Sequence, residues 1–417
     1  MATTRLIGAS IPRSGHHLLV RLLEGGLGAA FRFCEFYTPP ACCAQVPCAR
    51  ATTARVVLQK NHDFDLRLPD DLAGALYVVQ YRNAVDEALS DRELVGDVHG
   101  AARAADRDDY LVWLGTKLAY LVGFHRKWLA PPRAAALPLA YEDLIADPGA
   151  ALRALCERIG EPLNAAAVAA AVAAAVPFGG ERGERSYVRR PLGQRRFAHW
   201  DLLAVYESWL ARHAPALVGE RRAADVDDAG HPLIEIQRAE AARLTGSPGD
   251  AIAPLGRALE QMPDNPYAHL MLGALLGELG RWADAMVPLR RAARARPDDQ
   301  QVLVQLSLAQ WQTGAPAAAC QTAERLLVLY PAHDNYKLHL AGLAFAAHDD
   351  LRAHGLLDQV LAAAEPSVAN LVWAADMLAA RQMPRAALAA VERAFAIAPE
   401  RPDVGERLAR ARSACPP

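Results

Sequence analysis

The sequence predicts two regions of different architecture, an α/β domain built on a parallel sheet and an all-α solenoid. Over about the first 222 residues, short apolar runs that end in turns alternate with longer helical stretches, which is typical of parallel strands flanked by helices. After residue 232, prolines recur at separations of 34, 34, 35 and 33 residues, which indicates stacked helical pairs. At 417 residues, the chain is long enough for more than one core.

Four strands and four helices are expected in the first region. The strands are 5–9, 56–59, 76–80 and 136–140, and the helices are 14–24, 84–94, 109–129 and 148–159. Ligands of open α/β sheets bind beyond the carboxyl ends of the strands. We therefore expect four residues that follow strands, namely Arg13, Lys60, His62 and Arg82, to lie on one rim. Tyr110, Trp113, Tyr120 and Trp128 have helical spacing along 109–129 and are expected in the core.

The second region divides into repeats, each closed by a proline of the series Pro263, Pro297, Pro331, Pro366 and Pro399. Small residues recur twelve positions apart in each unit and would let its two helices approach closely. The pairs are Gly273 and Ala285, Ser307 and Ala319, Ala341 and Ala353, and Ala375 and Ala387, and the preceding segment has Ala239, Ala251 and Ala258. These units resemble the tetratricopeptide repeat, with Gly280 and Gly314 at the turn between helices. The alternative is a generic alanine-rich helical array.

The resulting organisation is an α/β domain over 1–222, a linker over 223–231, five repeats over 232–401, and a capping helix and tail over 402–417. A stack of repeats presents a groove that suits an extended peptide or a partner domain. The array is therefore expected to recruit a protein partner or a substrate.

The run Ile11 to Leu19, read I-P-R-S-G-H-H-L-L, follows the first strand and opens the first helix. Such a turn directs backbone N–H groups at one spot, which attracts phosphate or sulfate. The nucleotide-triphosphatase motif G-x-x-x-x-G-K-[ST] is absent, and Arg13 instead supplies a guanidinium that can grip an anion bidentately. The candidate anion-binding residues of this loop are Arg13, Ser14, Gly15, His16, His17 and Leu18.

Taken with three later segments, this loop resembles that of sulfotransferases that use 3′-phosphoadenosine 5′-phosphosulfate (PAPS), over about residues 4–215. Pro12 to Gly15 match the family's P-[KR]-S-G loop for the 5′-phosphosulfate, whereas His16 and His17 stand where the family has hydroxyl residues. Lys60-Asn61-His62 resembles its K-T-H motif. The resemblance implies that His62 is the general base and Lys60 its electrostatic partner. Relatives that act on carbohydrates use a glutamate of the first helix instead, so Glu24 is the alternative candidate for the general base.

The same resemblance extends to two further segments and a late arginine-rich run. Arg82 and Ser90 keep the spacing of the family's arginine and serine that bind the 3′-phosphate, with Ala84 in place of a proline. Tyr141-Glu142-Asp143-Leu144 is close to a structural Y-E-D-L run of the family. Arg189 or Arg190 is the candidate for a late arginine that reaches the 3′-phosphate, and a solvated basic loop is the alternative.

Composition narrows the classes of function and location. The net charge of −2 at pH 7 and the 22% charged residues give no support to nucleic-acid binding. No signal peptide and no apolar run long enough to cross a membrane is visible, so we expect a soluble cytoplasmic protein. Cys34, Cys42, Cys43 and Cys48 fit zinc spacing poorly, and ordinary thiols, a metal site and a local disulfide all stay open.

The resemblance implies an enzyme with a P-loop-like sulfotransferase fold that moves a sulfuryl group from PAPS to a hydroxyl or amine acceptor, with no metal. Arg13, Lys60 and the helix N-terminus would stabilise the charge that develops on oxygen. The sequence does not choose among carbohydrate, peptide, lipid and small-metabolite acceptors. The main alternative is a non-catalytic tetratricopeptide adaptor with a degenerate nucleotide-binding domain, and a nucleotide kinase is a third hypothesis.

Overall fold

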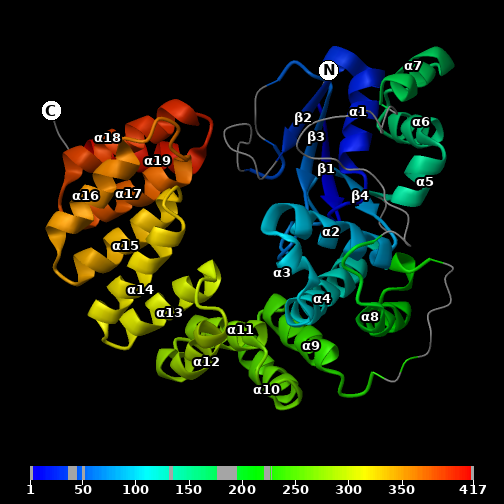
Figure 1. Cartoon of the computed structure of the whole chain (residues 1–417). Coiled ribbons are helices and arrows are strands. Elements are labelled where there is room, and N and C mark those ends of the chain that lie inside the picture. Colours follow the sequence, from blue (N-terminus) through cyan, green and yellow to red (C-terminus); the bar gives the residue numbers. More distant parts are fainter. Residues whose placement is uncertain are drawn as a thin grey trace. The chain divides into compact units, whose positions relative to one another are not determined.

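The computed structural model describes residues 3–35, 45–48, 52–130, 135–175, 195–219, 226 and 228–414. These residues form two compact units, which divide between Gln261 and Met262 (Figure 1). Within the described residues, no helix is both long enough and apolar enough to cross a membrane.

A five-stranded parallel sheet forms the centre of the first unit. Its strands are β1 (Thr4–Ser10), β2 (Phe31–Glu35), β3 (Val56–Asn61), β4 (Leu76–Tyr81) and β5 (Ala136–Ala140), arranged in the order β2-β3-β1-β4-β5. All four predicted strands are confirmed. β2 was not predicted, because its sequence of Phe, Arg, Phe, Cys and Glu alternates apolar and polar residues over only five positions.

The strand order places β1 at the topological switch point of the sheet. β1 pairs with β3 on one side and with β4 on the other, so that Ala9 lies opposite Asn61 and also opposite Val79. The chain leaves β1 toward β2 and β3, whereas β4 leads to β5 at the opposite edge. Ligands of such sheets bind beyond the carboxyl ends of the strands at the switch point, which here are the ends of β1 and its neighbours.

Helices cover both faces of the sheet (Figure 1). The first unit contains α1 (His16–Leu27), α2 (Ala84–His99), α3 (Ala101–Ala105), α4 (Arg107–Phe124), α5 (Tyr141–Ala146), α6 (Pro148–Arg158), α7 (Ala165–Ala175), α8 (Trp200–His213), α9 (Pro232–Leu244) and α10 (Ile252–Gln261). α1, α5, α6 and α7 share one apolar core with Leu6, Leu58 and Val78 of the sheet. On the other face, Tyr77 of β4 contacts Trp128, which follows α4, at 5.1 Å between ring centroids.

The hairpin of α9 and α10 belongs to this first unit. α9 packs on α4 so closely that a Cβ added to Gly115 would lie 2.6 Å from a methyl carbon of Ile236. We expected residues 232–261 to be the first member of the repeat array. The hairpin has the repeat's form, with Ala239, Ala251 and Ala258 buried, and its packing on α4 groups it with the N-terminal unit.

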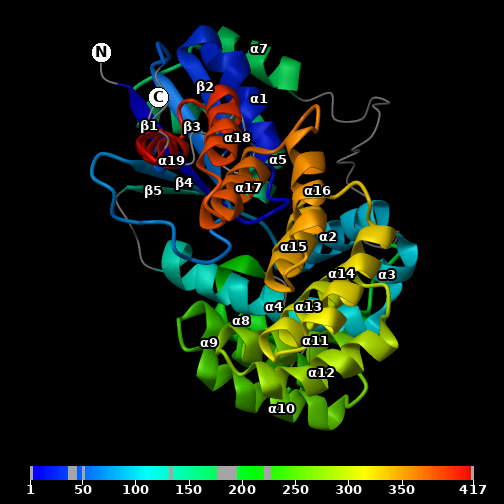
Figure 2. The ribbon, with the colours of Figure 1, turned by 90° about the vertical axis from the view of Figure 1, so that its left-hand side faces the viewer.

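The second unit is a series of antiparallel helical hairpins that stack in chain order (Figure 2). Its helices are α11 (Pro266–Glu278), α12 (Trp282–Ala295), α13 (Gln300–Gln312), α14 (Pro316–Leu329), α15 (Asp334–Ala346), α16 (Asp350–Leu361), α17 (Val368–Ala380), α18 (Pro384–Ile397) and α19 (Pro402–Ser413). The small residues predicted at the helix contacts are buried. A Cβ on Gly273 would lie 2.5 Å from Leu289 of α12, which shows how close the pair is.

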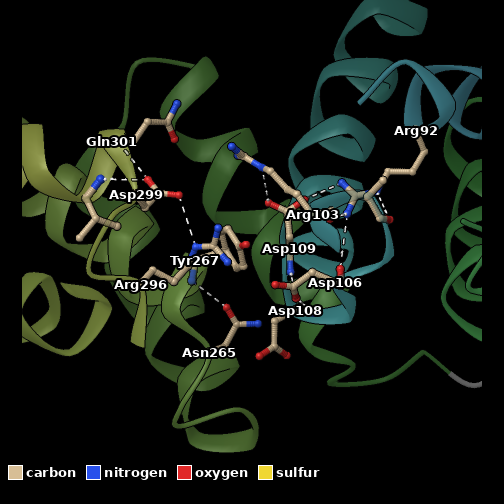
Figure 3. Close-up of polar contacts among 12 residues, drawn as sticks. Arg92, Arg103, Asp106, Asp108, Asp109, Asn265, Tyr267, Arg296, Asp299 and Gln301 are labelled. Atoms are coloured by element: carbon tan, nitrogen blue, oxygen red, sulfur yellow. Dashed lines mark hydrogen bonds and ion pairs between the residues drawn. The ribbon is translucent and has the colours of Figure 1, made fainter. Parts of the chain in front are cut away.

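Two further features recur every 34 residues and fix each hairpin. The turn between its helices has a left-handed residue at Gly246, Gly280, Gly314, His348 and Gln382. The first helix of most hairpins is capped by the residue just before it, whose side chain accepts hydrogen bonds from backbone N–H groups of the first turn. These caps are His231, Asn265, Asp299 and Ser367. Figure 3 includes the caps Asn265 and Asp299, the latter also paired with Arg296.

Candidate functional site

The loop between β1 and α1 has an unusual backbone. Arg13 and Gly15 both have positive φ, 63° and 82°. Gly15 lies against Tyr141, since a Cβ there would come within 2.6 Å of the Tyr141 ring. The Ser14 hydroxyl donates to the Ile11 carbonyl at 2.6 Å and thereby closes the loop on itself. The loop leads directly into the N-terminus of α1, whose first turn contains no acidic residue.

Arg82 and Ser90, which are distant from the loop in sequence, both contact Arg13 of this loop. Arg13 Nε donates to Ser90 Oγ of α2 at 3.2 Å, and Arg82 Nη1 donates to the Arg13 carbonyl at 3.3 Å. Arg82 lies after β4, is only 5% exposed, and packs over the Tyr141 ring at 4.4 Å. Its Nε is buried and has no hydrogen-bond partner among the described residues. Two guanidinium groups and a hydroxyl together can hold a phosphate or sulfate group.

A second cluster lies on the β3 side of β1. Lys60 and Glu35 are opposite each other at the ends of β3 and β2, and Lys60 Nζ donates to Glu35 Oε1 at 2.7 Å. His62 Nδ1 lies 2.7 Å from the Ser10 carbonyl oxygen and 3.1 Å from the Ser10 hydroxyl. Because a carbonyl oxygen only accepts, Nδ1 carries the proton of the neutral ring and Nε2 carries the lone pair.

The electrostatic environment keeps the histidines of this cluster neutral. Burial, and to a smaller extent Lys60, lowers the pKa of His62 to about 4. His17 is exposed, but partial desolvation of its ring lowers its pKa, again with Lys60 contributing. For Glu35, partial burial opposes ionisation, but the hydrogen bond and charge of Lys60 outweigh it and lower the pKa of the carboxyl group. At neutral pH the cluster therefore holds an ion pair and an uncharged imidazole base.

Other predicted loop residues have roles inside the protein. His16 is buried, its Nδ1 lies 3.2 Å from Gln80 Oε1, and burial lowers its pKa well below the usual value. The Leu18 side chain is in the core, and its backbone N–H is taken by the Gly15 carbonyl at 3.0 Å. The Ser14 hydroxyl is likewise used within the loop. His17 is exposed at the loop surface.

Two residues next to these clusters were not predicted as site residues. Tyr141 lies against both Gly15 and Arg82, although the sequence suggested only a structural role for its segment. Its position directly after β5, at the same rim as the other strand ends, could have indicated this. Glu35 is the carboxylate beside Lys60, whereas Glu24, the weighed alternative, is exposed on α1. Because β2 was not predicted, Glu35 at its end was not recognised as a residue of the site.

A buried network of charged side chains joins α2, close to Ser90, to α4. Lys117 of α4 lies 2.8 Å from Glu87 and 2.9 Å from Asp91. Burial raises the pKa of Glu87 to about 7, and the two carboxylates hold the pKa of Lys117 above its usual value although burial opposes this. A second buried pair joins Arg92 of α2 to Asp109 of α4 at 2.6 Å (Figure 3).

The remaining predictions concern two late arginines, the cysteines, a metal site and the aromatic residues of the long middle helix. Arg189, Arg190, Cys42 and Cys43 lie outside the described residues. Cys34 and Cys48 are both buried. Within the described part of the chain, no three His, Cys, Asp or Glu side chains are grouped to hold a metal ion. Of the four aromatic residues predicted in the core, Tyr110, Tyr120 and Trp128 are buried, and Trp113 is half-buried.

Comparison with known proteins concerns the helical hairpins. No curated protein matched the sequence. Among solved structures, a tetratricopeptide repeat protein from Parabacteroides merdae is 16% identical, with 65% of this chain and 98% of that chain covered and a TM-score of 0.37. MamA is 15% identical over 41% and 96% of the two chains, and pilF of Pseudomonas aeruginosa is 19% identical over 44% and 83%, each with a TM-score of 0.34.

The family model for the tetratricopeptide repeat matches residues 242–309. That stretch includes a complete period of the left-handed turns and two of the capped helix starts described above. Residues 242–309 therefore match the tetratricopeptide repeat, and the later hairpins continue the same 34-residue series of left-handed turns.

Proposed function

We propose that the N-terminal unit is a sulfotransferase that moves a sulfuryl group from PAPS to a hydroxyl or amine acceptor. The observation that carries the proposal is the meeting of Arg13, Arg82 and Ser90 beside the β1–α1 loop, with Lys60 and His62 at the neighbouring strand end. PAPS carries a phosphate at the 3′ position and a phosphosulfate at the 5′ position. A cluster with two arginines on one side of the switch point, and Lys60 with a neutral imidazole on the other side, suit such a ligand.

In this proposal, Arg82 and Ser90 bind the 3′-phosphate, with Arg189 or Arg190 as further candidates. The N-terminus of α1, with Arg13 and the backbone of Ser14 to His17, faces the 5′-phosphosulfate. His16 and Leu18 shape the loop from inside, because both side chains are buried. No metal is required by this scheme.

The transfer step needs alignment and charge stabilisation more than covalent catalysis. A bond forms between the acceptor oxygen and sulfur while the bond from sulfur to the 5′-phosphate oxygen breaks. The acceptor proton passes to Nε2 of His62, which is neutral at pH 7 and oriented by Ser10. Lys60 stabilises the oxygen that leaves, and adenosine 3′,5′-bisphosphate is released. Glu35 is the competing base, because its carboxylate is held beside Lys60.

Nucleotide binding is tested by thermal unfolding with adenosine 3′,5′-bisphosphate. A ligand at about 100 times its Kd adds about 2.7 kcal/mol of stability, which raises the melting temperature by several degrees. Arg82→Ala should abolish this rise. The matched control is Arg55→Ala, because Arg55 is exposed, precedes β3 at the amino end of the strands, and pairs with Glu161. No rise in the unmodified protein, or an equal rise after Arg82→Ala, would refute the site.

Catalysis is tested by PAPS consumption with three probe acceptors, an aryl alcohol, a simple sugar and a tyrosine-containing peptide. His62→Ala and Glu35→Gln separate the two candidate bases. Loss of a base that acts in proton transfer lowers turnover by about 10²- to 10⁴-fold. The variant that loses turnover while it still binds the bisphosphate identifies the base.

The repeats supply the second half of the proposed function. Tetratricopeptide arrays bind extended peptides or partner domains along their helical surfaces, so we assign the array to recruitment of a protein partner or substrate. A non-catalytic adaptor is the second candidate, favoured by one observation: His16 replaces a hydroxyl residue and turns inward to Gln80. An adaptor would show no PAPS consumption in any variant.

A further inference from the structure

The loop that begins at His62 has a constrained backbone. Over residues 62–68 it contains two left-handed residues other than glycine, Asp63 with φ 48° and Leu66 with φ 58°. A residue with a Cβ adopts this conformation only where surrounding contacts hold it there. The side chain of Asn61 accepts the Asp63 N–H at 2.7 Å and starts the turn.

The carboxylate of Asp63 is fully buried and holds the loop through several hydrogen bonds. Its Oδ2 accepts from Lys127 Nζ at 2.7 Å and from Trp128 Nε1 at 2.8 Å, and its Oδ1 accepts the Leu68 N–H at 2.7 Å. Lys127 also donates to the carbonyl groups of Leu66 and Leu68. The three protons of the ammonium group therefore all bind this loop. The donors come from a π-helical turn, His125–Leu129, which follows α4 and brings two adjacent residues to one oxygen atom.

The last turns of α4 hold the same loop at two further points. The Tyr120 hydroxyl donates to the backbone carbonyl of His62 at 2.6 Å. Gly123 leaves space for the Leu66 side chain, because a Cβ there would lie 2.3 Å from Leu66 Cδ1. Contacts at 120, 123 and 127 follow one face of the helix and its extension. α4 and its extension therefore clamp the loop along its whole length.

We propose that Asp63, Lys127 and Tyr120 are positioning residues that hold the His62 imidazole on the Ser10 carbonyl and direct its Nε2 toward the acceptor. This inference rests on the proposed role of His62. The peptide that links His62 to Asp63 is fixed on one side by the Tyr120 hydroxyl and on the other by the left-handed turn at Asp63. Release of either contact frees the His62 backbone to rotate, and the hydrogen bond between Nδ1 and Ser10 is then lost.

The test follows the ring of His62 by nitrogen-15 NMR of the full-length, histidine-labelled protein, with His62→Gln to assign the resonance. The unmodified protein should show one tautomer with a protected Nδ1 proton and a pKa well below 6.5. Asp63→Asn should give mixed tautomers, an exchanging Nδ1 proton and a pKa that moves toward 6.5. Tyr120→Phe removes a single hydroxyl group and should shift the resonance in the same direction, so it serves where Asp63→Asn unfolds.

The matched control is Asp109→Asn, which breaks another buried carboxylate pair, with Arg92, on the same helix (Figure 3). Asp109→Asn should lower the stability of the protein and leave the His62 spectrum unchanged. In the loop variants turnover should fall as well, because a 1 Å displacement of the base costs about 100-fold. Adenosine 3′,5′-bisphosphate affinity should be unchanged in Tyr120→Phe. An unaltered tautomer in both loop variants, or an equal change in Asp109→Asn, would overturn the positioning role. Absence of sulfuryl transfer with an intact NMR result would refute only the proposed function.

Discussion

Replacement of Gly15 by alanine tests whether the loop after β1 depends on its close fit to Tyr141. Gly15 has φ 82°, and a Cβ there would lie 2.6 Å from Cδ2 and 3.0 Å from Cε2 of the Tyr141 ring. Leu144 follows at 3.3 Å, so the added methyl group meets two side chains at once. Either the ring or the loop must move.

The size of the effect follows from two costs and one gain. A left-handed residue with a Cβ costs about 1–2 kcal/mol. Forcing a methyl group into packed surroundings costs about 1–3 kcal/mol more. Alanine in place of glycine restricts the unfolded chain, which returns about 0.4–1 kcal/mol. We expect Gly15→Ala to lower the free energy of unfolding of the N-terminal unit by about 1–4 kcal/mol.

The matched control is Gly74→Ala. Gly74 has φ 72°, but nothing lies within 4 Å of its added Cβ, so only the backbone cost of about 1 kcal/mol remains. Urea unfolding of the full chain, followed by peptide-resolved hydrogen exchange, reports on the N-terminal unit separately from the repeats. Gly15→Ala should also lose affinity for adenosine 3′,5′-bisphosphate. Equal stabilities of the two variants would show that contact with Tyr141 does not determine the loop.

Three further predictions concern pH, the repeats and the domain boundary. The ordinary pKa of histidine is 6.5, and the pKa of His62 in the folded protein is about 4. Between these values the unfolded chain binds more protons than the folded protein, so stability rises with pH across that window. His62→Gln should flatten this rise in urea titrations at different pH, and an unchanged slope would contradict the shift. In the repeats, Gly314→Ala should destabilise by about 1 kcal/mol and His348→Gly should not destabilise, because both turn residues are left-handed; thermal unfolding that ranks them in reverse would contradict this. A fragment of residues 1–261 should fold whereas 1–231 should not, because α9 packs on Gly115 of α4, and folded circular dichroism for the shorter fragment would refute the boundary.

The helical repeats were predictable in detail because their contacts are local. Each hairpin buries small residues twelve positions apart, so the spacing of alanines and prolines carries most of the structure. The capping helix predicted from 402 to 413 is α19, Pro402–Ser413. His348 and Gln382 occupy left-handed turn positions without being glycine, so glycine alone did not reveal the full series.

The candidate site was predictable only in part. Arg13, Lys60, His62 and Arg82 follow strands whose apolar runs are visible in the sequence, and parallel strands bring their carboxyl ends to one rim. Glu35 and Tyr141 were missed as site residues, the first because β2 is short and mixed in character. The inward turn of His16 was also hidden, since its bond to Gln80 joins residues 64 apart in the chain.

The sequence by itself determined the two architectures, the three strand ends that bear Arg13, Lys60 with His62, and Arg82, and the 34-residue period, because these depend on spacing along the chain. The tertiary structure decided which of the charged residues pair with one another. It also decided that the first repeat-like hairpin groups with the N-terminal unit, and that α4 holds the loop of His62. These outcomes depend on which distant side chains fit against each other, and no local pattern records the close contacts of Gly15 with Tyr141, Gly115 with Ile236 or Gly123 with Leu66.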